Sequence, residues 1–177
     1  GQGCIDLTKH PFYNSSYLHP RDGIENDRKI EYKIIPTNKC GSNANKSRIV
    51  IFIHCAVKRF QRRHLIRSTW VPNYSIWGFE ISVVFIVGVL SGNSSESVQL
   101  ELQQEAELNN DVIQVDFLEH YKNLTFKHLS ALHWIKTYCS HTKYVIKVDD
   151  DVLINIPNLI QYLEIKDSTG SMHNSIT

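Results

Sequence analysis

The sequence predicts an α/β fold with an open, mainly parallel sheet flanked by helices. Runs of β-branched and aromatic residues such as 49–53 are typical of strands buried on both faces of a parallel sheet. These runs alternate with helical stretches, which supply the crossovers that parallel strands need. With 177 residues, of which 42% are hydrophobic, the chain is long enough to bury the core of one such domain.

The predicted elements alternate along the chain after residue 47. Strands are expected at residues 49–53, 81–89, 112–117 and 144–148. Helices are expected at residues 58–70, 94–108, 119–139 and 159–165, with Pro157 suited to a first helical turn. Because open parallel sheets bind ligands at the carboxyl ends of their strands, functional residues are expected there.

The first 46 residues differ from the rest of the chain. They are polar, contain Pro11, Pro20 and Pro36, and have only a short apolar run at residues 30–35. We expect a stem or irregular lead-in over 1–46, with an edge element of the sheet as the alternative. The main domain is expected over 47–177.

The overall charge excludes some classes of function. Lysine and arginine total 19 against 18 aspartates and glutamates, so a net charge of +1 gives no reason to expect binding to nucleic acid or to a membrane surface.

No stretch approaches the roughly 20 apolar residues of a membrane span, and no signal-like run follows Gly1. We expect this chain to be soluble as given, with any membrane anchor in a segment outside it.

Glycosylation acceptors and cysteines indicate a secretory compartment. Asn-x-Ser/Thr sequences occur five times, more often than expected by chance, at Asn14, Asn45, Asn73, Asn93 and Asn123. The cysteines lack Cys-x-x-Cys spacing, which disfavours zinc, and an oxidising compartment allows up to two disulfides.

The predicted topology restricts the cysteine pairing. Cys55 and Cys139 are expected at opposite ends of neighbouring parallel strands, so they should not pair. We expect Cys40 to pair with Cys4 or Cys139, and four buried thiols are the alternative.

Three consecutive carboxylates, Asp149, Asp150 and Asp151, follow the apolar strand at 144–148. Adjacent anions at the end of a buried strand need a cation or hydrogen-bond donors, and carboxylates suit a hard divalent ion that also binds diphosphate oxygens. The alternative is a solvated acidic turn that caps the helix at Pro157.

Arginines Arg59, Arg63 and Arg67 recur at i, i+4 and i+8, which places them on nearly one face of the first helix. One or more of them could bind a diphosphate bidentately. A solvated basic face, or non-specific binding of polyanions, is the alternative. The turn at residues 54–57 has no Gly-x-Gly-x-x-Gly sequence, which argues against the usual dinucleotide fold and a P-loop. Among the histidines, His54 is a candidate because it ends the first strand at the expected ligand edge.

Four segments, in this order and spacing, resemble the β-1,3-galactosyltransferase family of Golgi glycosyltransferases from about residue 47 to residue 165. They are residues 63–70 (RHLIRSTW), 116–127 (DFLEHYKNLTFK), Trp134 with Cys139, and 147–155 (KVDDDVLIN).

The resemblance implies a GT-A fold, with residues 47–177 as its nucleotide-sugar-binding half, cut after the strand that carries the Asp-x-Asp motif. It implies a type II membrane protein on the lumenal side of the Golgi. The activity it implies is inverting transfer of galactose or an N-acetylhexosamine from a UDP-sugar, with Mn²⁺, in β-1,3 linkage to an acceptor glycan on a glycoprotein or glycolipid.

The resemblance also implies the roles of individual residues. Asp151 would bind the metal directly, and Asp149 and Asp150 would contact the sugar nucleotide or waters on the metal, so that Asp149 and Asp151 form the metal site. The nucleotide-sugar site would further include Arg63, Arg67 and Asp116. The catalytic base is expected in a downstream Glu-Asp-Val segment beyond Thr177, so no catalytic residue is assigned.

Two functions of other classes remain as alternatives. A non-catalytic protein that binds UDP-sugars or glycans would use the same site without turnover. A calcium-binding adhesion module would use the aspartates but leave the arginine helix without a role.

Overall fold

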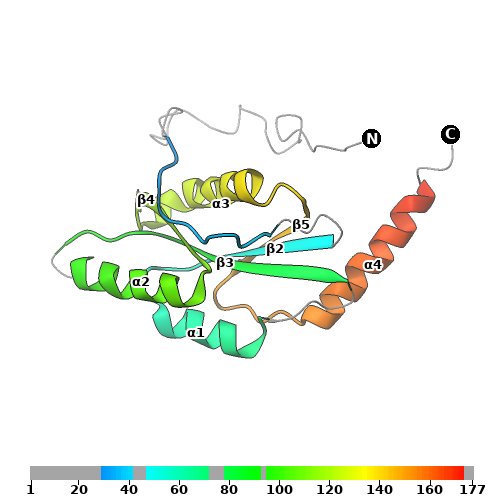
Figure 1. The fold of residues 1–177 in the computed structure, drawn as a ribbon, viewed down its shortest axis with the longest axis horizontal. Coiled ribbons are helices and arrows are strands. Elements are labelled where there is room, and N and C mark those ends of the chain that lie inside the picture. Colours follow the sequence, from blue (N-terminus) through cyan, green and yellow to red (C-terminus); the bar gives the residue numbers. More distant parts are fainter. Residues whose placement is uncertain (1–28, 42–46, 72–77, 93–94, 174–177) are drawn as a thin grey trace. The chain divides into compact units, whose positions relative to one another are not determined.

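The computed structural model describes residues 29–41, 47–71, 78–92 and 95–173, and Glu31–Thr177 forms one compact unit. Its centre is a five-stranded sheet in the order β1-β4-β3-β2-β5 (Figure 1). The strands are β1 (Tyr32–Ile34), β2 (Ser47–His54), β3 (Phe79–Val89), β4 (Val112–Leu118) and β5 (Thr142–Asp149). The helices are α1 (Phe60–Thr69), α2 (Ser95–Asn109), α3 (Leu124–Tyr138) and α4 (Ile156–His173), with a 3-10 turn η4 (Tyr121–Asn123) before α3.

The predicted fold class is confirmed, with all four predicted strands and four predicted helices present. β2 to β5 pair in parallel, whereas β1 pairs antiparallel with β4. β1 falls in the apolar run at 30–35, for which the sequence left open an edge element. The division of the chain at residue 47 stays a prediction.

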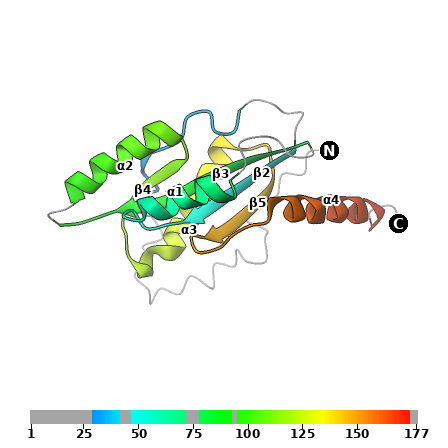
Figure 2. The same ribbon diagram turned by 90° about the horizontal axis from the view of Figure 1, so that it is seen from below.

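Helices cover both faces of the sheet, with α1 and α2 on one face and α3 on the other (Figures 1 and 2). Alternate residues of β2, including Ile49, Ile51 and Ile53, join the core on the α1 and α2 side, to which α4 also contributes Ile156 and Ile160. The intervening β2 residues are equally buried, so both faces of this strand are covered. Among the described residues, no helix combines the length and apolar composition needed to cross a bilayer.

The order of the strands creates a topological switch point between β2 and β5. The chain runs from β2 to β3 to β4 in one direction, and then returns past β2 to form β5. Because crossovers are right-handed, the return helix α3 must lie on the opposite face from α1 and α2, as observed. His54 and Asp149 are register partners at the carboxyl ends of these two strands.

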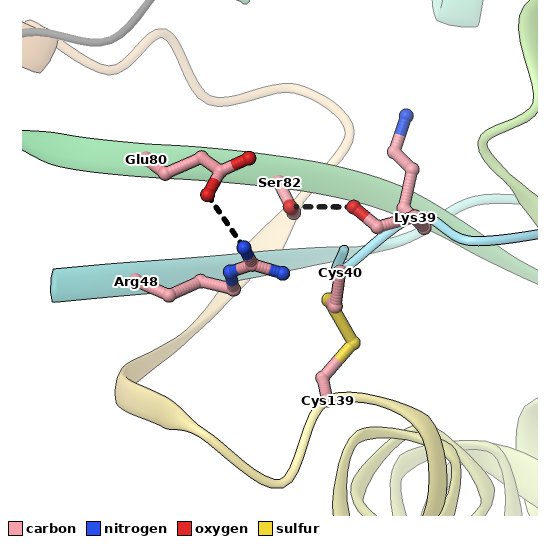
Figure 3. The surroundings of a disulfide bond; sticks show 6 residues. All are labelled: Lys39, Cys40, Arg48, Glu80, Ser82 and Cys139. Carbon is pink, nitrogen blue, oxygen red and sulfur yellow. Dashed lines mark hydrogen bonds and ion pairs between the residues drawn. A yellow bond between two sulfur atoms is a disulfide. The ribbon is translucent and has the colours of Figure 1, made fainter. Parts of the chain in front are cut away.

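A disulfide joins Cys40 to Cys139 at the opposite edge of the sheet (Figure 3). It connects the segment before β2 with the end of α3, near the ion pair of the buried Arg48 with Glu80. This confirms one of the two expected partners of Cys40, and the alternative of four free thiols is wrong. Cys55 is buried and free. This agrees with the expectation that Cys55 and Cys139 do not pair. Cys4 lies outside the described residues.

Removing the disulfide should destabilise the domain without changing the architecture of the sheet. The bond closes a loop with a sequence separation of 99 residues. We therefore expect Cys139→Ser to lower the free energy of unfolding by about 2–5 kcal/mol. Denaturant unfolding of oxidised wild type, reduced wild type and the variant measures this effect. If reduction leaves the wild-type midpoint unchanged, the bond does not stabilise the fold.

Candidate functional site

The candidate site lies at the carboxyl edge of the sheet, where β5 ends beside β2. Asp149 is the last residue of β5, and Asp150 and Asp151 follow in a turn in which the Val152 amide donates to the Asp149 carbonyl at 3.3 Å. The apolar residues of β5 on the α1 side fix the register of this strand through packing, so the aspartates emerge at the switch point. This is the part of an open α/β sheet where ligands bind.

The three aspartates have different surroundings. Asp149 is 59% exposed and pairs with Lys147 at 2.5 Å, which lowers the pKa of the Asp149 carboxyl. Asp150 is only 8% exposed, and its Oδ1 accepts a hydrogen bond from Arg59 at 2.7 Å. Its Oδ2 is buried and has no hydrogen-bond partner in the described structure. Asp151 is exposed, so its carboxylate is accessible to a ligand.

The alternative of a solvated acidic turn that caps the following helix is wrong about the cap, although Asp149 and Asp151 are solvated as it expected. The side chain of Asn155 caps this helix, because its Oδ1 accepts a hydrogen bond from the Asn158 amide at 3.1 Å. The three aspartates therefore have no role in capping α4.

His54 lies at the predicted edge and is held in its neutral form. Burial, followed by the charges of Lys127 and Lys147, lowers the pKa of His54 to about 4. The His54 Nε2 atom is buried without a hydrogen-bond partner in the described part of the chain. The imidazole packs against Phe52 and His128, with ring centroids 5.8 and 5.7 Å away. Its position is as expected, and its functional role stays a prediction.

Arg63 does not lie on a solvated surface, as one alternative supposed. Its side chain is 0% exposed and pairs with Glu105 at 2.6 Å. The same guanidinium donates to the carbonyls of Ala56 and Val57, at 2.9 and 3.0 Å, and contacts the sulfur of Cys55. These contacts occupy the donors that a nucleotide would need, and the predicted direct contact between Arg63 and a nucleotide stays a prediction.

Arg67 belongs to the same group of buried charges. It shares Glu105 with Arg63 and binds both carboxylate oxygens of Asp111 at 2.8 Å. Its side chain is 15% exposed, so the solvated-face alternative is wrong here too, and its predicted contact with a nucleotide stays a prediction. Arg59, by contrast, is 56% exposed and reaches Asp150.

Asp116 is not brought together with the three aspartates in the described structure. It is 43% exposed on β4 and pairs with Lys33 at 3.5 Å. It lines a cavity of about 1120 Å³ with residues of α2 such as Gln99 and Gln103. Its contact with a nucleotide remains a prediction.

Sequence reasoning assigned no role to Glu119 and Lys127, which form a buried ion pair at 2.6 Å beside the site. The Lys127 ammonium also donates to the Cys55 carbonyl at 2.8 Å, and the other oxygen of Glu119 accepts from the Gly88 amide at 2.8 Å. A Cβ at Gly88 would lie 2.7 Å from the Phe117 carbonyl oxygen, so only glycine permits this approach of β3 to β4. Both residues belong to the segment 116–127, which carries part of the family resemblance. That membership was the signal that could have identified them from the sequence.

Comparison with known proteins places the chain in a family. The model of the galactosyltransferase family matches residues 61–177. The chain belongs to the galactosyltransferase family. Beta-1,3-galactosyltransferase 1 of Homo sapiens and of Mus musculus are each 36% identical over 144 residues, which cover 81% of this chain and 42% of each relative. UDP-GalNAc:beta-1,3-N-acetylgalactosaminyltransferase 1 of Mus musculus is 36% identical over 115 residues, covering 65% of this chain and 35% of that protein. The chain therefore spans less than half the length of these relatives.

The donor atoms at the site fit a divalent cation that is bound jointly with a phosphate ligand. Among the described residues, no group of three or more His, Cys, Asp or Glu side chains could hold a metal without help. Ions such as Mg²⁺ are usually bound by one or two carboxylates together with substrate phosphates, rather than by a cage of protein ligands. Asp149 and Asp151 are the two exposed carboxylates of the group that could serve in this way.

Only Asn123 of the five predicted glycosylation acceptors lies in the described residues. Its amide nitrogen donates to the Leu118 carbonyl at 2.8 Å and its side chain is partly buried. Asn14, Asn45, Asn73 and Asn93 lie outside these residues, and glycosylation at all five positions stays a prediction.

The depressed pKa of His54 makes stability depend on pH. An unfolded histidine binds a proton below about pH 6.5, whereas the folded His54 does so only near pH 4. Stability from this residue is present above pH 6.5 and is lost as the pH falls toward 4. Since His54 is partly exposed, we expect wild type to lose about 1 kcal/mol more stability than His54→Gln between pH 7 and pH 5. Urea unfolding at both pH values measures the difference, and equal losses would contradict it.

Proposed function

We propose that the protein containing this chain is a hexosyltransferase that moves galactose or an N-acetylhexosamine from a UDP-sugar to an acceptor glycan in β-1,3 linkage. The chain supplies the donor-binding half. The observation that carries the proposal is the position of three aspartates at the β2/β5 switch point, with one buried carboxylate oxygen of Asp150 left without a partner. Membership of the galactosyltransferase family gives this arrangement its chemistry.

Each aspartate has a role that follows from its exposure. Asp151 is exposed and would bind the metal ion together with Asp149, which would first release Lys147. Asp150, held by Arg59, would orient the sugar nucleotide or a water near the metal. A bound Mn²⁺ would neutralise charge on the departing diphosphate.

The names of the relatives support a hexosyl donor without choosing one. One relative is named for galactose and another for N-acetylgalactosamine. We propose that the reaction inverts the anomeric centre, and that the base that activates the acceptor hydroxyl lies in a segment outside this chain. The acceptor would be a glycan on a glycoprotein or glycolipid.

The disulfide and the glycosylation sequences support a position in the secretory pathway. A buried Cys40–Cys139 bond persists in an oxidising compartment, and the Asn-x-Ser/Thr sequences are acceptors in the same compartment. We place the protein on the lumenal side of the Golgi membrane, as a type II protein whose anchor would lie in a segment outside this chain.

Loss of the Asp151 carboxylate should abolish metal-dependent binding of UDP. Asp151→Asn keeps the size of the side chain but removes a charged metal ligand, so we expect UDP affinity in Mn²⁺ to fall by at least about 100-fold. Calorimetry with UDP in Mn²⁺ and in a chelator measures this on the full-length protein. Asp167→Asn is the matched control, because Asp167 lies on α4 and pairs with Lys143 at the start of β5, away from the site.

The same experiment separates the proposal from its alternatives. If Asp151→Asn binds UDP as wild type does, the metal site is elsewhere. Release of free sugar from a labelled UDP-sugar by the wild type supports an enzyme, whereas UDP binding without any turnover supports a binding protein. Calcium affinity that is unaffected by UDP would favour an adhesion module.

A further inference from the structure

Three successive backbone carbonyls at the end of β2 accept hydrogen bonds from buried cations. The Cys55 carbonyl accepts from the Lys127 ammonium at 2.8 Å. The Ala56 and Val57 carbonyls accept from the two terminal nitrogens of Arg63, at 2.9 and 3.0 Å. We call residues 55–57 the β2–α1 turn.

The two cations reach this turn from opposite faces of the sheet. Arg63 lies on α1 and Lys127 on α3, and these helices cover different faces (Figure 2). Their side chains are 0% and 3% exposed, respectively. Each is neutralised by a partly buried carboxylate, Glu105 for Arg63 and Glu119 for Lys127. Because desolvating two ion pairs is costly, packing alone does not explain why polar side chains converge on one short turn.

The turn is in direct contact with the proposed donor site. The Arg59 amide donates to the Ala56 carbonyl at 3.0 Å, and this bond holds Arg59, the N-cap of α1, against the turn. The side chain of Arg59 in turn holds Oδ1 of Asp150 at 2.7 Å. A shift of the β2–α1 turn would therefore move both Arg59 and the buried aspartate of the site.

We propose that Arg63 and Lys127 are positioning residues that clamp the β2–α1 turn, so that Arg59 and Asp150 are presented to the diphosphate of the donor. This inference rests on the proposed function and deepens it. In this arrangement Arg63 acts on the nucleotide through the turn, because its own donors are directed to two protein carbonyls and to the carboxylate of Glu105. Affinity for the donor then depends on two residues that lie on different helices and bond to neighbouring carbonyls of one three-residue turn.

The guanidinium of Arg63 is suited to this role by its shape. Its planar fork binds Glu105 and two carbonyls at once, and all of these partners lie in fixed directions. A lysine at the same position keeps the charge opposite Glu105 but offers one compact ammonium, which cannot serve both carbonyls and the carboxylate in that geometry. Arg63→Lys thus releases the turn without leaving Glu105 as an uncompensated buried anion.

The test compares Arg63→Lys and Lys127→Met with Arg48→Lys in the full-length protein. Arg48 is a matched control, because it is 3% exposed and paired with Glu80 at 2.5 Å, but lies at the other end of β2 and makes no contact with the turn. Five quantities are measured: the melting temperature, the Kd of UDP in Mn²⁺, the KM of the donor, the KM of the acceptor, and amide hydrogen exchange over residues 55–59.

We expect all three variants to melt at lower temperature. Arg63→Lys and Lys127→Met should weaken UDP binding and raise the donor KM by about 10-fold or more, with the acceptor KM unchanged. Both should also accelerate exchange at the Arg59 amide, which bonds within the turn. Arg48→Lys should change neither the donor KM nor the exchange of the turn. If one of the two variants fails to fold, the other still decides the outcome.

Two results would overturn the inference. Loss of UDP affinity in Arg63→Lys with normal affinity in Lys127→Met would mean that Arg63 contacts the phosphates directly. Equal loss of affinity in all three variants would mean that destabilisation alone is responsible. Wild-type protein that binds no UDP would instead defeat the proposed function, while hydrogen exchange would still show whether the two cations hold the turn.

Discussion

The reversal of strand order after β4 is the constraint on which the rest of the structure depends. Because β5 returns beside β2, the aspartates that end β5 lie next to His54 at the end of β2. Had β5 continued outward beyond β4, the same sequence would have placed its carboxylates two strands away from the arginine helix. The reversal also places α3 on the opposite face from α1, so that side chains from both helices reach the β2–α1 turn.

The charges next to the site divide into two groups with different functions. Arg63 and Lys127 are buried and paired with partly buried carboxylates, which suits a fixed scaffold. Asp149, Asp151 and Arg59 are exposed and can exchange partners when a ligand arrives. In the proposed mechanism the exposed group would carry the chemistry, and the buried group would determine where that chemistry takes place.

The sequence predicted the secondary structure well because local patterns determine it. The run at 49–53 is buried on both faces, and the helix at 58–70 appears as α1 within two residues at its start. β1 remained one of two possibilities, since three residues pairing at an edge carry little signal. The position of the three aspartates at the edge of the sheet was also predictable, because they directly follow an apolar run that is typical of a buried strand.

The burial of the arginines could not be predicted in the same way. Arg63 is polar by type, and its partner Glu105 lies 42 residues away on another helix, so no local spacing connects them. The sheet order that brings α1 and α2 onto one face had to be known first. Only then can the exposed Arg59 be distinguished from the buried Arg63. Arg59 is the N-cap of α1 at the open edge, whereas Arg63 lies one turn further along the helix, on its covered face. A regular i, i+4 pattern thus contains residues of both groups, and solvent exposure decides which of them is available to a ligand.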